Sequence, residues 1–163
     1  MTIHRDMFDE PKQKPTVMVS GGFDPVHAGH IRMILDAAKW GDVIVIANSD
    51  RWLFEKKGFV FMHFEQRAEI LNAIKGVVLV DSVDDSDGTV CEAIRRIKPT
   101  YFANGGDRGR NNTPEQDVCE ELGVEMLWSI GGDEKRDSSS DLVERVRKET
   151  QTPIRNKTKH SEK

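Results

Sequence analysis

Short apolar runs alternate with helical patterns along most of the chain, and this alternation constrains the fold more than any other feature of the sequence. The helical patterns are amphipathic and cover Gly29–Lys39, Phe64–Lys75, Val90–Lys98 and Pro114–Leu122. The apolar runs are rich in β-branched residues, as buried strands are, and cover Thr16–Val19, Val43–Ala47, Val77–Val80, Thr100–Ala103 and Val124–Trp128. Strands that alternate with helices form parallel sheets covered on both faces. The sequence therefore predicts an α/β fold, a doubly wound parallel sheet of about five strands.

The 163 residues are enough for one domain with a real core, and no internal repeat divides them. Residues 1–15 are polar and aperiodic, so we expect a flexible N-terminal extension there. The domain is expected over residues 16–149, with a last helix from about Ser140 to Glu149. Residues 150–163 are rich in Lys, Ser and Thr, which predicts a disordered C-terminal tail.

Composition excludes several classes of function. A formal net charge of −4 argues against a general nucleic-acid binder, which is usually basic. No segment approaches the roughly 20 apolar residues that span a bilayer, so no membrane partner is expected. Cys91 and Cys119 lie far apart and fit neither a metal pattern nor a disulfide framework. We therefore expect a cytoplasmic protein with reduced thiols.

The stretch SGGFDPVHAGHI follows the first predicted strand and runs into the first predicted helix. Ligands of doubly wound sheets bind outside the carboxyl ends of strands. Gly21 and Gly22 allow a tight turn and a close approach of a ligand to the backbone. Gly29 and His30 open a helix whose free N–H groups favour an anion, and His27 and His30 can donate hydrogen bonds to phosphate oxygens. Together these features indicate a phosphate site.

Two histidines three residues apart also suit a helix cap or a pair of zinc ligands. Two nitrogen ligands do not complete a zinc site, and no nearby Cys or third His stands at the required spacing. A metal-dependent hydrolase that uses His27 and His30 stays an alternative, and it predicts tightly bound zinc.

The complete string GGFDPVHAGHI resembles the H-x-G-H signature of the cytidylyltransferase-like nucleotidyltransferases, and the resemblance extends over roughly Val17 to Val146. It implies a Rossmann-like domain that moves a nucleoside monophosphate from CTP or ATP onto a phosphorylated small acceptor and releases pyrophosphate. It also implies Mg²⁺ on the triphosphate and a homodimer. In this motif it assigns to the nucleotide Gly21, Gly22, Phe23, Asp24, His27, Gly29 and His30, of which the two histidines are catalytic.

Further segments are similar to family members by position and residue type. Asp50 belongs to NSD, a polar turn that precedes a mobile lysine-bearing loop in relatives, and EKKG supplies Lys56 and Lys57. The segment FEQRAEIL resembles a helix start of glycerol-phosphate and heptose-phosphate relatives and supplies Arg67. The resemblance assigns Asp50, Lys56, Lys57 and Arg67 to the acceptor, and makes Lys57 and Arg67 catalytic as well. No residue is assigned to a metal.

Two later segments complete the expected nucleotide site. YFANGGDRG is similar to the GGD segment of heptose-1-phosphate adenylyltransferases, and RDSSSDLVERV resembles the Ser/Thr cluster that opens the last helix of the family. A plain turn and a plain helix cap would also account for these two segments. By resemblance they assign to the nucleotide Asn104, Gly105, Gly106, Asp107, Arg136, Ser138, Ser139 and Ser140.

The acceptor favoured by these matches is a sugar or polyol phosphate such as glycerol 3-phosphate or heptose 1-phosphate. The segment KRDSSSD departs from the R-T-x-G-I-S-T pattern of glycerol-3-phosphate cytidylyltransferases, so Arg136 does not decide between CTP and ATP. The form FDPVH is also similar to nicotinate-mononucleotide and phosphopantetheine adenylyltransferases, which stay an alternative. A non-catalytic nucleotide-binding domain is the alternative of another class.

Overall fold

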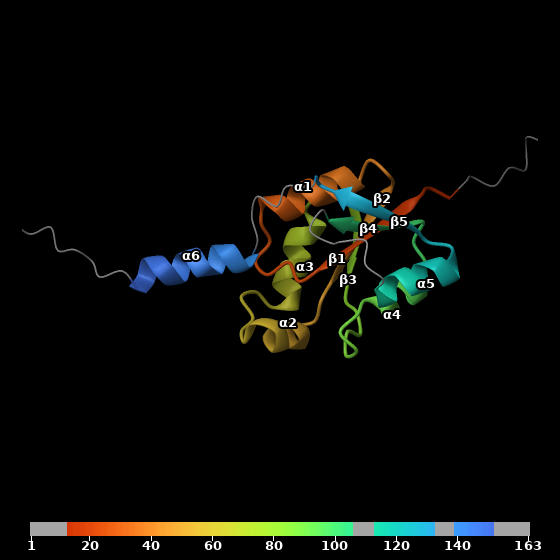
Figure 1. Cartoon of the computed structure of the whole chain (residues 1–163). Coiled ribbons are helices and arrows are strands. Elements are labelled where there is room, and N and C mark those ends of the chain that lie inside the picture. The colour runs from red at the N-terminus through yellow and green to blue at the C-terminus, as the bar shows by residue number, and fades with distance from the viewer. Residues whose placement is uncertain (1–12, 106–112, 133–138, 152–163) are drawn as a thin grey trace, which may run out of the picture.

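The computed structural model describes residues 13–105, 113–132 and 139–151 (Figure 1). Five parallel strands form one sheet in the order β3-β2-β1-β4-β5. The strands are β1 Thr16–Gly21, β2 Asp42–Ala47, β3 Val77–Asp81, β4 Tyr101–Gly105 and β5 Glu125–Ile130. The predicted α/β class and the predicted five-stranded, Rossmann-like parallel sheet are confirmed.

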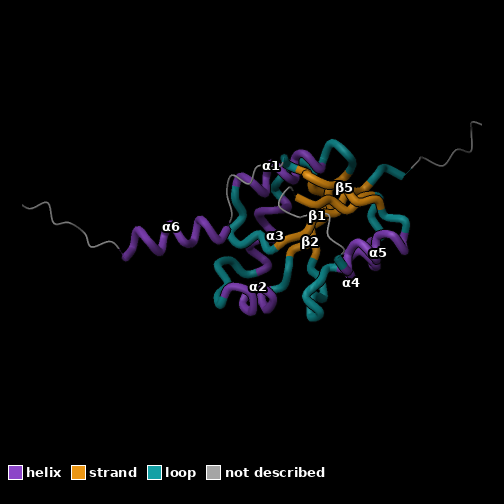
Figure 2. The backbone as a smooth tube through the Cα atoms, in the orientation of Figure 1, coloured by secondary structure: helices purple, strands orange, loops and turns teal. Residues whose placement is uncertain are grey.

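Helices cover both faces of this sheet, as a doubly wound fold requires (Figure 2). The helices are α1 Ala28–Ala37, α2 Asp50–Lys57, α3 Phe64–Asn72, α4 Cys91–Ile97, α5 Pro114–Leu122 and α6 Ser139–Gln151. Helices α1 and α3 pack on one face with one core cluster, and α4 and α5 pack on the other face with a second. Helix α6 has no buried residue and projects away from the sheet (Figure 1).

The central strand β1 shows why the strands read as continuous apolar runs. Val17 and Val19 belong to the cluster under α1 and α3, while Met18 between them belongs to the cluster under α4 and α5. All three side chains are fully buried. A strand buried on both faces has no polar alternation, because successive side chains enter different layers of core.

The strand order places a topological switch next to the motif. Strand β1 pairs with β2 on one side and with β4 on the other. The chain runs from β1 outward to β2 and β3 and then crosses back to β4, so the strand order reverses between β1 and β4. A crevice for a ligand is expected outside the carboxyl ends of the strands at such a point. The carboxyl end of β1 is Gly21, at the start of the GGFDPVHAGH string.

The structure differs from the sequence-based expectation at α2. Relatives carry a mobile lysine-bearing loop after a polar turn like NSD, and no helix was expected there. The chain instead forms a helix capped by the Ser49 side chain, which accepts from Trp52 N, and ended by Gly58 at φ 83°. The last helix reaches Gln151, just into the expected tail. The expected extension and tail otherwise lie outside the described residues. Within the described parts of the chain, no helix is both long and apolar enough to cross a membrane.

Candidate nucleotide-binding site

The two motif histidines cap the start of α1 through one ring nitrogen each. Gly29 N donates to His27 Nδ1 at 3.0 Å, and His27 N donates to His30 Nδ1 at 3.2 Å. The two rings stack with their centroids 3.8 Å apart. Because each Nδ1 accepts a backbone hydrogen bond, the hydrogen of a neutral ring is assigned to Nε2. Each Nε2–H is then a donor that helix capping does not use.

His30 is held in its neutral form. Burial, and then the neighbouring His27, lower the pKa of His30 from its ordinary value of 6.5 to about 3. The edge of its ring contacts Phe23, with centroids 4.9 Å apart. At neutral pH this side chain therefore offers an N–H hydrogen bond rather than a positive charge, and the start of α1 adds its positive dipole end.

The turn between β1 and α1 is tight and packs closely on α2. Phe23 is 2% exposed and adopts the left-handed conformation at φ 51°, and the Asp24–Pro25 peptide bond is cis. A Cβ at Gly22 would lie 2.9 Å from Leu53 Cδ2, so a larger residue fits there only if the Leu53 side chain moves. A Cβ at Gly21 would make an ordinary contact with the Phe23 ring.

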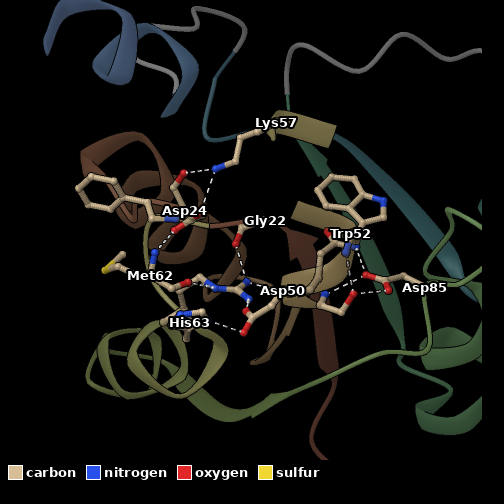
Figure 3. Close-up of polar contacts among 12 residues, drawn as sticks. Gly22, Asp24, Asp50, Trp52, Lys57, Met62, His63 and Asp85 are labelled. Carbon is tan, nitrogen blue, oxygen red and sulfur yellow. Dashed lines mark hydrogen bonds and ion pairs between the residues drawn. The ribbon is translucent and has the colours of Figure 1, made fainter. Parts of the chain in front are cut away.

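Asp24 connects the motif to α2 and to the segment before α3 (Figure 3). Its carboxylate is fully buried and accepts from Lys57 Nζ at 2.9 Å, Phe61 N at 2.8 Å and Met62 N at 2.6 Å. Lys57 Nζ also donates to the Asp24 backbone carbonyl at 2.7 Å. The sequence assigned Asp24 to the nucleotide, and the structure shows its oxygens bonded to the protein itself. An ammonium has three donors, so Lys57 keeps one for a ligand.

Arg67 is fully buried and lies beneath the motif turn. Its Nε donates to Met62 O at 2.9 Å, its Nη1 to Gly22 O and Asn48 O at 2.8 Å each, and its Nη2 to Asp50 Oδ1 at 2.7 Å. The sequence predicted that Arg67 contacts a phosphate. The structure instead turns the guanidinium into the protein, where it joins the ends of β1 and β2 to the start of α3.

Asp50, which the sequence assigned to the acceptor, is also engaged by the protein. His63 Nδ1 lies 2.9 Å from its Oδ2, while Arg67 takes its Oδ1. Partial burial raises the pKa of Asp50, but the hydrogen bonds from His63 and Arg67 outweigh it and leave this pKa below its ordinary value. Asp50 is therefore a carboxylate at neutral pH, and it balances the buried charge of Arg67.

A second buried carboxylate, Asp85, fixes the start of α2, and sequence reasoning missed it. It accepts from Asn48 Nδ2 at 3.0 Å, from Ser49 N at 2.8 Å and from Ser49 Oγ at 2.6 Å. Burial raises the pKa of Asp85, but the hydrogen bonds from Ser49 and Asn48 lower it by more than burial raises it. The pKa of Asp85 therefore lies below its ordinary value. The one available signal was a helix-capping serine after a strand; nothing in the acidic loop around Asp85 distinguishes it from its neighbours.

The β4 and α6 segments contribute the remaining described residues. Asn104 is buried and donates from Nδ2 to Leu127 O at 3.3 Å, and Gly105 ends β4. Ser139 Oγ donates to Pro25 O at 2.9 Å, which brings the first residue of α6 to the motif, and Ser140 beside it is exposed. Four predicted site residues lie outside the described residues: Gly106, Asp107, Arg136 and Ser138.

The described residues gather hydrogen-bond donors beside the motif turn. The Nε2 atoms of His27 and His30 and the ammonium of Lys57 belong to side chains around this turn at the carboxyl edge of the sheet, and Ser139 reaches the turn through its bond to Pro25 O. Within residues 13–105, 113–132 and 139–151, no group of three or more His, Cys, Asp or Glu side chains could hold a metal ion. These donors suit phosphate oxygens.

A family model described as cytidylyltransferase-like matches residues 18–145 of this chain. The chain belongs to the cytidylyltransferase-like family. Membership confirms the expected class of enzyme, a nucleotidyltransferase.

Two relatives and one solved structure show how far the similarity reaches. Bifunctional protein HldE of Enterobacter sp. is 33% identical over 144 residues, which are 83% of this chain and 28% of that protein. FAD synthase of Thermococcus kodakarensis is 34% identical over 122 residues, 72% of this chain and 75% of that enzyme. The crystal structure of a lipopolysaccharide core biosynthesis protein from Thermoplasma volcanium has a TM-score of 0.60 and 22% identity, and the match covers 71% of this chain and 93% of that one. This last likeness supports the fold alone.

Proposed function

We propose that the protein transfers a nucleoside monophosphate from CTP or ATP onto a phosphorylated small acceptor and releases pyrophosphate. The acceptor is a sugar or polyol phosphate such as heptose 1-phosphate or glycerol 3-phosphate. One observation carries the proposal: His27 and His30 each accept a backbone hydrogen bond at Nδ1, so the hydrogen of each neutral ring is assigned to Nε2 at the start of α1. A family member with that arrangement has donors suited to a triphosphate.

The reaction needs no covalent intermediate. A phosphate oxygen of the acceptor forms a bond to the α-phosphorus of the triphosphate, and the bond from that phosphorus to the bridging oxygen breaks. Pyrophosphate leaves on the opposite side with the electron pair of that bond. Because the attacking phosphate is already ionised, no general base is required, and catalysis consists of positioning and of stabilising charge on the oxygens.

Each described side chain has a place in this reaction. His27 and His30 donate from Nε2 to oxygens around the α- and β-phosphates. Lys57 uses its remaining ammonium donor on the acceptor phosphate or the α-phosphate, while Asp24 holds it in place. Ser139 and Ser140 lie at the start of α6, where the helix N–H groups and the Ser140 hydroxyl suit the β- and γ-phosphates, while the Ser139 hydroxyl holds the helix start to Pro25 O.

Magnesium is proposed as the ion that accompanies the triphosphate. Mg²⁺ keeps several waters and takes phosphate oxygens together with only one or two carboxylates. The described residues offer no cage for it, and the buried Asp24 carboxylate is bonded to Lys57 and two backbone N–H groups. The residues that the structure describes therefore do not fit a resident metal, and the triphosphate is proposed to supply the ligands. We expect that chelation with EDTA stops turnover and that added Mg²⁺ restores it.

The relatives support the direction of the proposal. FAD is a flavin mononucleotide joined to AMP, so an enzyme named FAD synthase makes a product of the expected kind. The chain spans 28% of the length of HldE, so the activity of that whole protein does not transfer to this chain. A homodimer and a cytoplasmic location are further parts of the proposal, on the family resemblance.

A pyrophosphate-release screen tests the function. Four nucleoside triphosphates are crossed with sugar, polyol and amino-alcohol phosphates in the presence of Mg²⁺. We expect one pair to support turnover, and His30→Ala to lower kcat about 100-fold, as loss of one transition-state donor does. If no pair releases pyrophosphate but the protein binds a nucleotide tightly, a non-catalytic binding domain is favoured. Tightly bound zinc in elemental analysis would favour the metal-dependent hydrolase.

A further inference from the structure

Trp52 lies on the acceptor side of the proposed site. The nucleotide crevice is expected at the switch between β1 and β4, where Asn104 and Gly105 end β4. Trp52 belongs to the first turn of α2, which follows β2, on the other side of β1. A side chain in this position borders the part of the site away from the nucleotide.

The backbone of Trp52 is held firmly. Its N–H donates to Ser49 Oγ at 3.0 Å, and that hydroxyl donates in turn to Asp85 Oδ1 at 2.6 Å. Leu53, the next residue, is buried against the Gly22 turn. The indole is therefore presented by a capped and packed helix start, which is a rigid support for a recognition surface.

The indole itself faces the motif turn. A Cβ at Gly22 would lie 3.6 Å from Trp52 Cζ3, so the ring edge stands beside the phosphate-binding turn. Figure 3 shows the indole and the Lys57 side chain on one side of Gly22, and Asp50 and His63 on the other. Lys56 Nζ lies 4.6 Å from the centroid of the indole ring, one helical turn further along α2. The indole is only half-buried.

We propose that Trp52 forms a wall of the acceptor subsite and that the acceptor carries a ring, either a closed sugar ring or a heteroaromatic ring, on its phosphate. This rests on the proposed function. A flat apolar surface beside two lysines suits a molecule with a ring face at one end and a phosphate at the other. Lys57 meets the phosphate with its remaining donor, while the ring packs against the indole. An open chain such as glycerol 3-phosphate has no face to offer.

Steady-state pyrophosphate release tests the assignment with three acceptors: a pyranose 1-phosphate, flavin mononucleotide and glycerol 3-phosphate. We expect the wild type to prefer one of the two ring-bearing acceptors. The preferred acceptor shows whether the subsite takes a closed sugar ring or a heteroaromatic ring. Trp52→Ala should raise the acceptor KM about 10-fold and leave the nucleotide KM unchanged, and Trp52→Phe should keep most of the affinity. Trp40→Phe is the matched control, since Trp40 is 45% exposed and lies at the opposite edge of the sheet.

Equilibrium binding gives a second measurement that does not need turnover. Retention of each acceptor on the protein is measured by dialysis with a non-hydrolysable triphosphate present, for the wild type, Trp52→Ala and Trp40→Phe. We expect only Trp52→Ala to lose the ring-bearing acceptor. Preference for glycerol 3-phosphate, or an unchanged acceptor affinity in Trp52→Ala, overturns the assignment. If no pair releases pyrophosphate, the proposed function fails, and the dialysis still decides whether Trp52 contacts a ring-bearing phosphate.

Discussion

At the scale of single residues, the two motif histidines combine two roles that make opposite demands on a side chain. A helix cap needs an acceptor, and a phosphate contact needs a donor. The imidazole ring carries one of each when it is neutral. His27 and His30 cap α1 through Nδ1, and the proposed phosphate contacts use Nε2–H. The same side chains therefore stabilise the helix and prepare the binding site.

Burial of neutral His30 predicts a specific acid sensitivity. Its pKa is about 3 in the folded protein and 6.5 ordinarily, so between these values the unfolded chain binds more protons than the folded one. The free energy of unfolding must then fall as pH falls through this window, by about 3 kcal/mol at pH 4.5. His30→Gln removes the titrating group. Urea unfolding measures the free energy of unfolding of both proteins at pH 7 and pH 4.5. The decrease between the two pH values should be smaller by that amount in His30→Gln than in the wild type, and equal decreases would contradict the assignment.

Arg67 should be among the most sensitive positions for stability. Arg67→Met would leave Gly22 O, Asn48 O and Met62 O without their donor and Asp50 without its cation. Each buried carbonyl left without its donor costs about 1–3 kcal/mol, while the partly exposed Asp50 adds less than a fully buried carboxylate would. Arg67→Lys should recover less than half, because an ammonium cannot reproduce the planar fork of donors.

Urea unfolding measures these Arg67 variants against a surface arginine. Arg95 pairs with Glu121 in an exposed ion pair, and Arg95→Met should barely move the unfolding midpoint. Similar midpoints for Arg67→Met and Arg95→Met would show that the buried guanidinium does not hold the strand ends together.

At the scale of elements, α2 shows where sequence reasoning failed and why. It is short and polar and buries only Leu53, so it has no apolar stripe to reveal a helical period. Its signals are local: the Ser49 cap, Asp50 in the first turn, Lys56 and Lys57 in the last turn and Gly58 after the end. The long strand and helix patterns were predictable because a buried face imposes a period, which α2 lacks.

The cap of α2 should matter more than an equivalent cap elsewhere. Ser49→Ala removes the acceptor for Trp52 N and also the donor to buried Asp85. Thr113→Ala is a matched control, because Thr113 caps α5 and accepts from Gln116 N. Losing a cap costs about 1 kcal/mol, and losing a hydrogen bond to a charged group adds about 1.5–3 kcal/mol.

Amide hydrogen exchange shows which helix each substitution destabilises. Amides of α2 should exchange faster in Ser49→Ala, while α5 stays protected, and the reverse should hold in Thr113→Ala. If Ser49→Ala and Thr113→Ala lower the free energy of unfolding equally, the hydrogen bond from Ser49 to Asp85 contributes nothing beyond an ordinary helix cap.

At the scale of the whole molecule, the sheet order decides which segments meet, and this was only partly predictable. The rule that ligands bind at the carboxyl edge of a parallel sheet placed the motif correctly in advance. The links that shape the site join residues far apart in the chain, such as Asp24 with Met62 and Asn48 with Asp85. Polar partners of this kind leave no period or spacing, so they become visible only when neighbouring strands are known.

Ligand mapping over the whole molecule tests the location of the site. A non-hydrolysable triphosphate with Mg²⁺ should slow amide hydrogen exchange at the start of α1 and at the start of α6, because the proposed contacts place phosphate oxygens at the positive ends of both helices. Residues 40–42 and 75–77 lie at the amino edge of the sheet and serve as internal controls that should not change.

The variant with both His27→Ala and His30→Ala decides whether this protection comes from the proposed contacts. The two alanines remove both Nε2–H donors and both Nδ1 caps, so the nucleotide should no longer protect α1 at a concentration that saturates the wild type. The separate His30→Gln variant, whose longer amide side chain keeps one polar acceptor and one donor, should retain part of the effect. Protection confined to the amino edge, or full protection in the double alanine variant, would place the nucleotide away from the motif and refute the site.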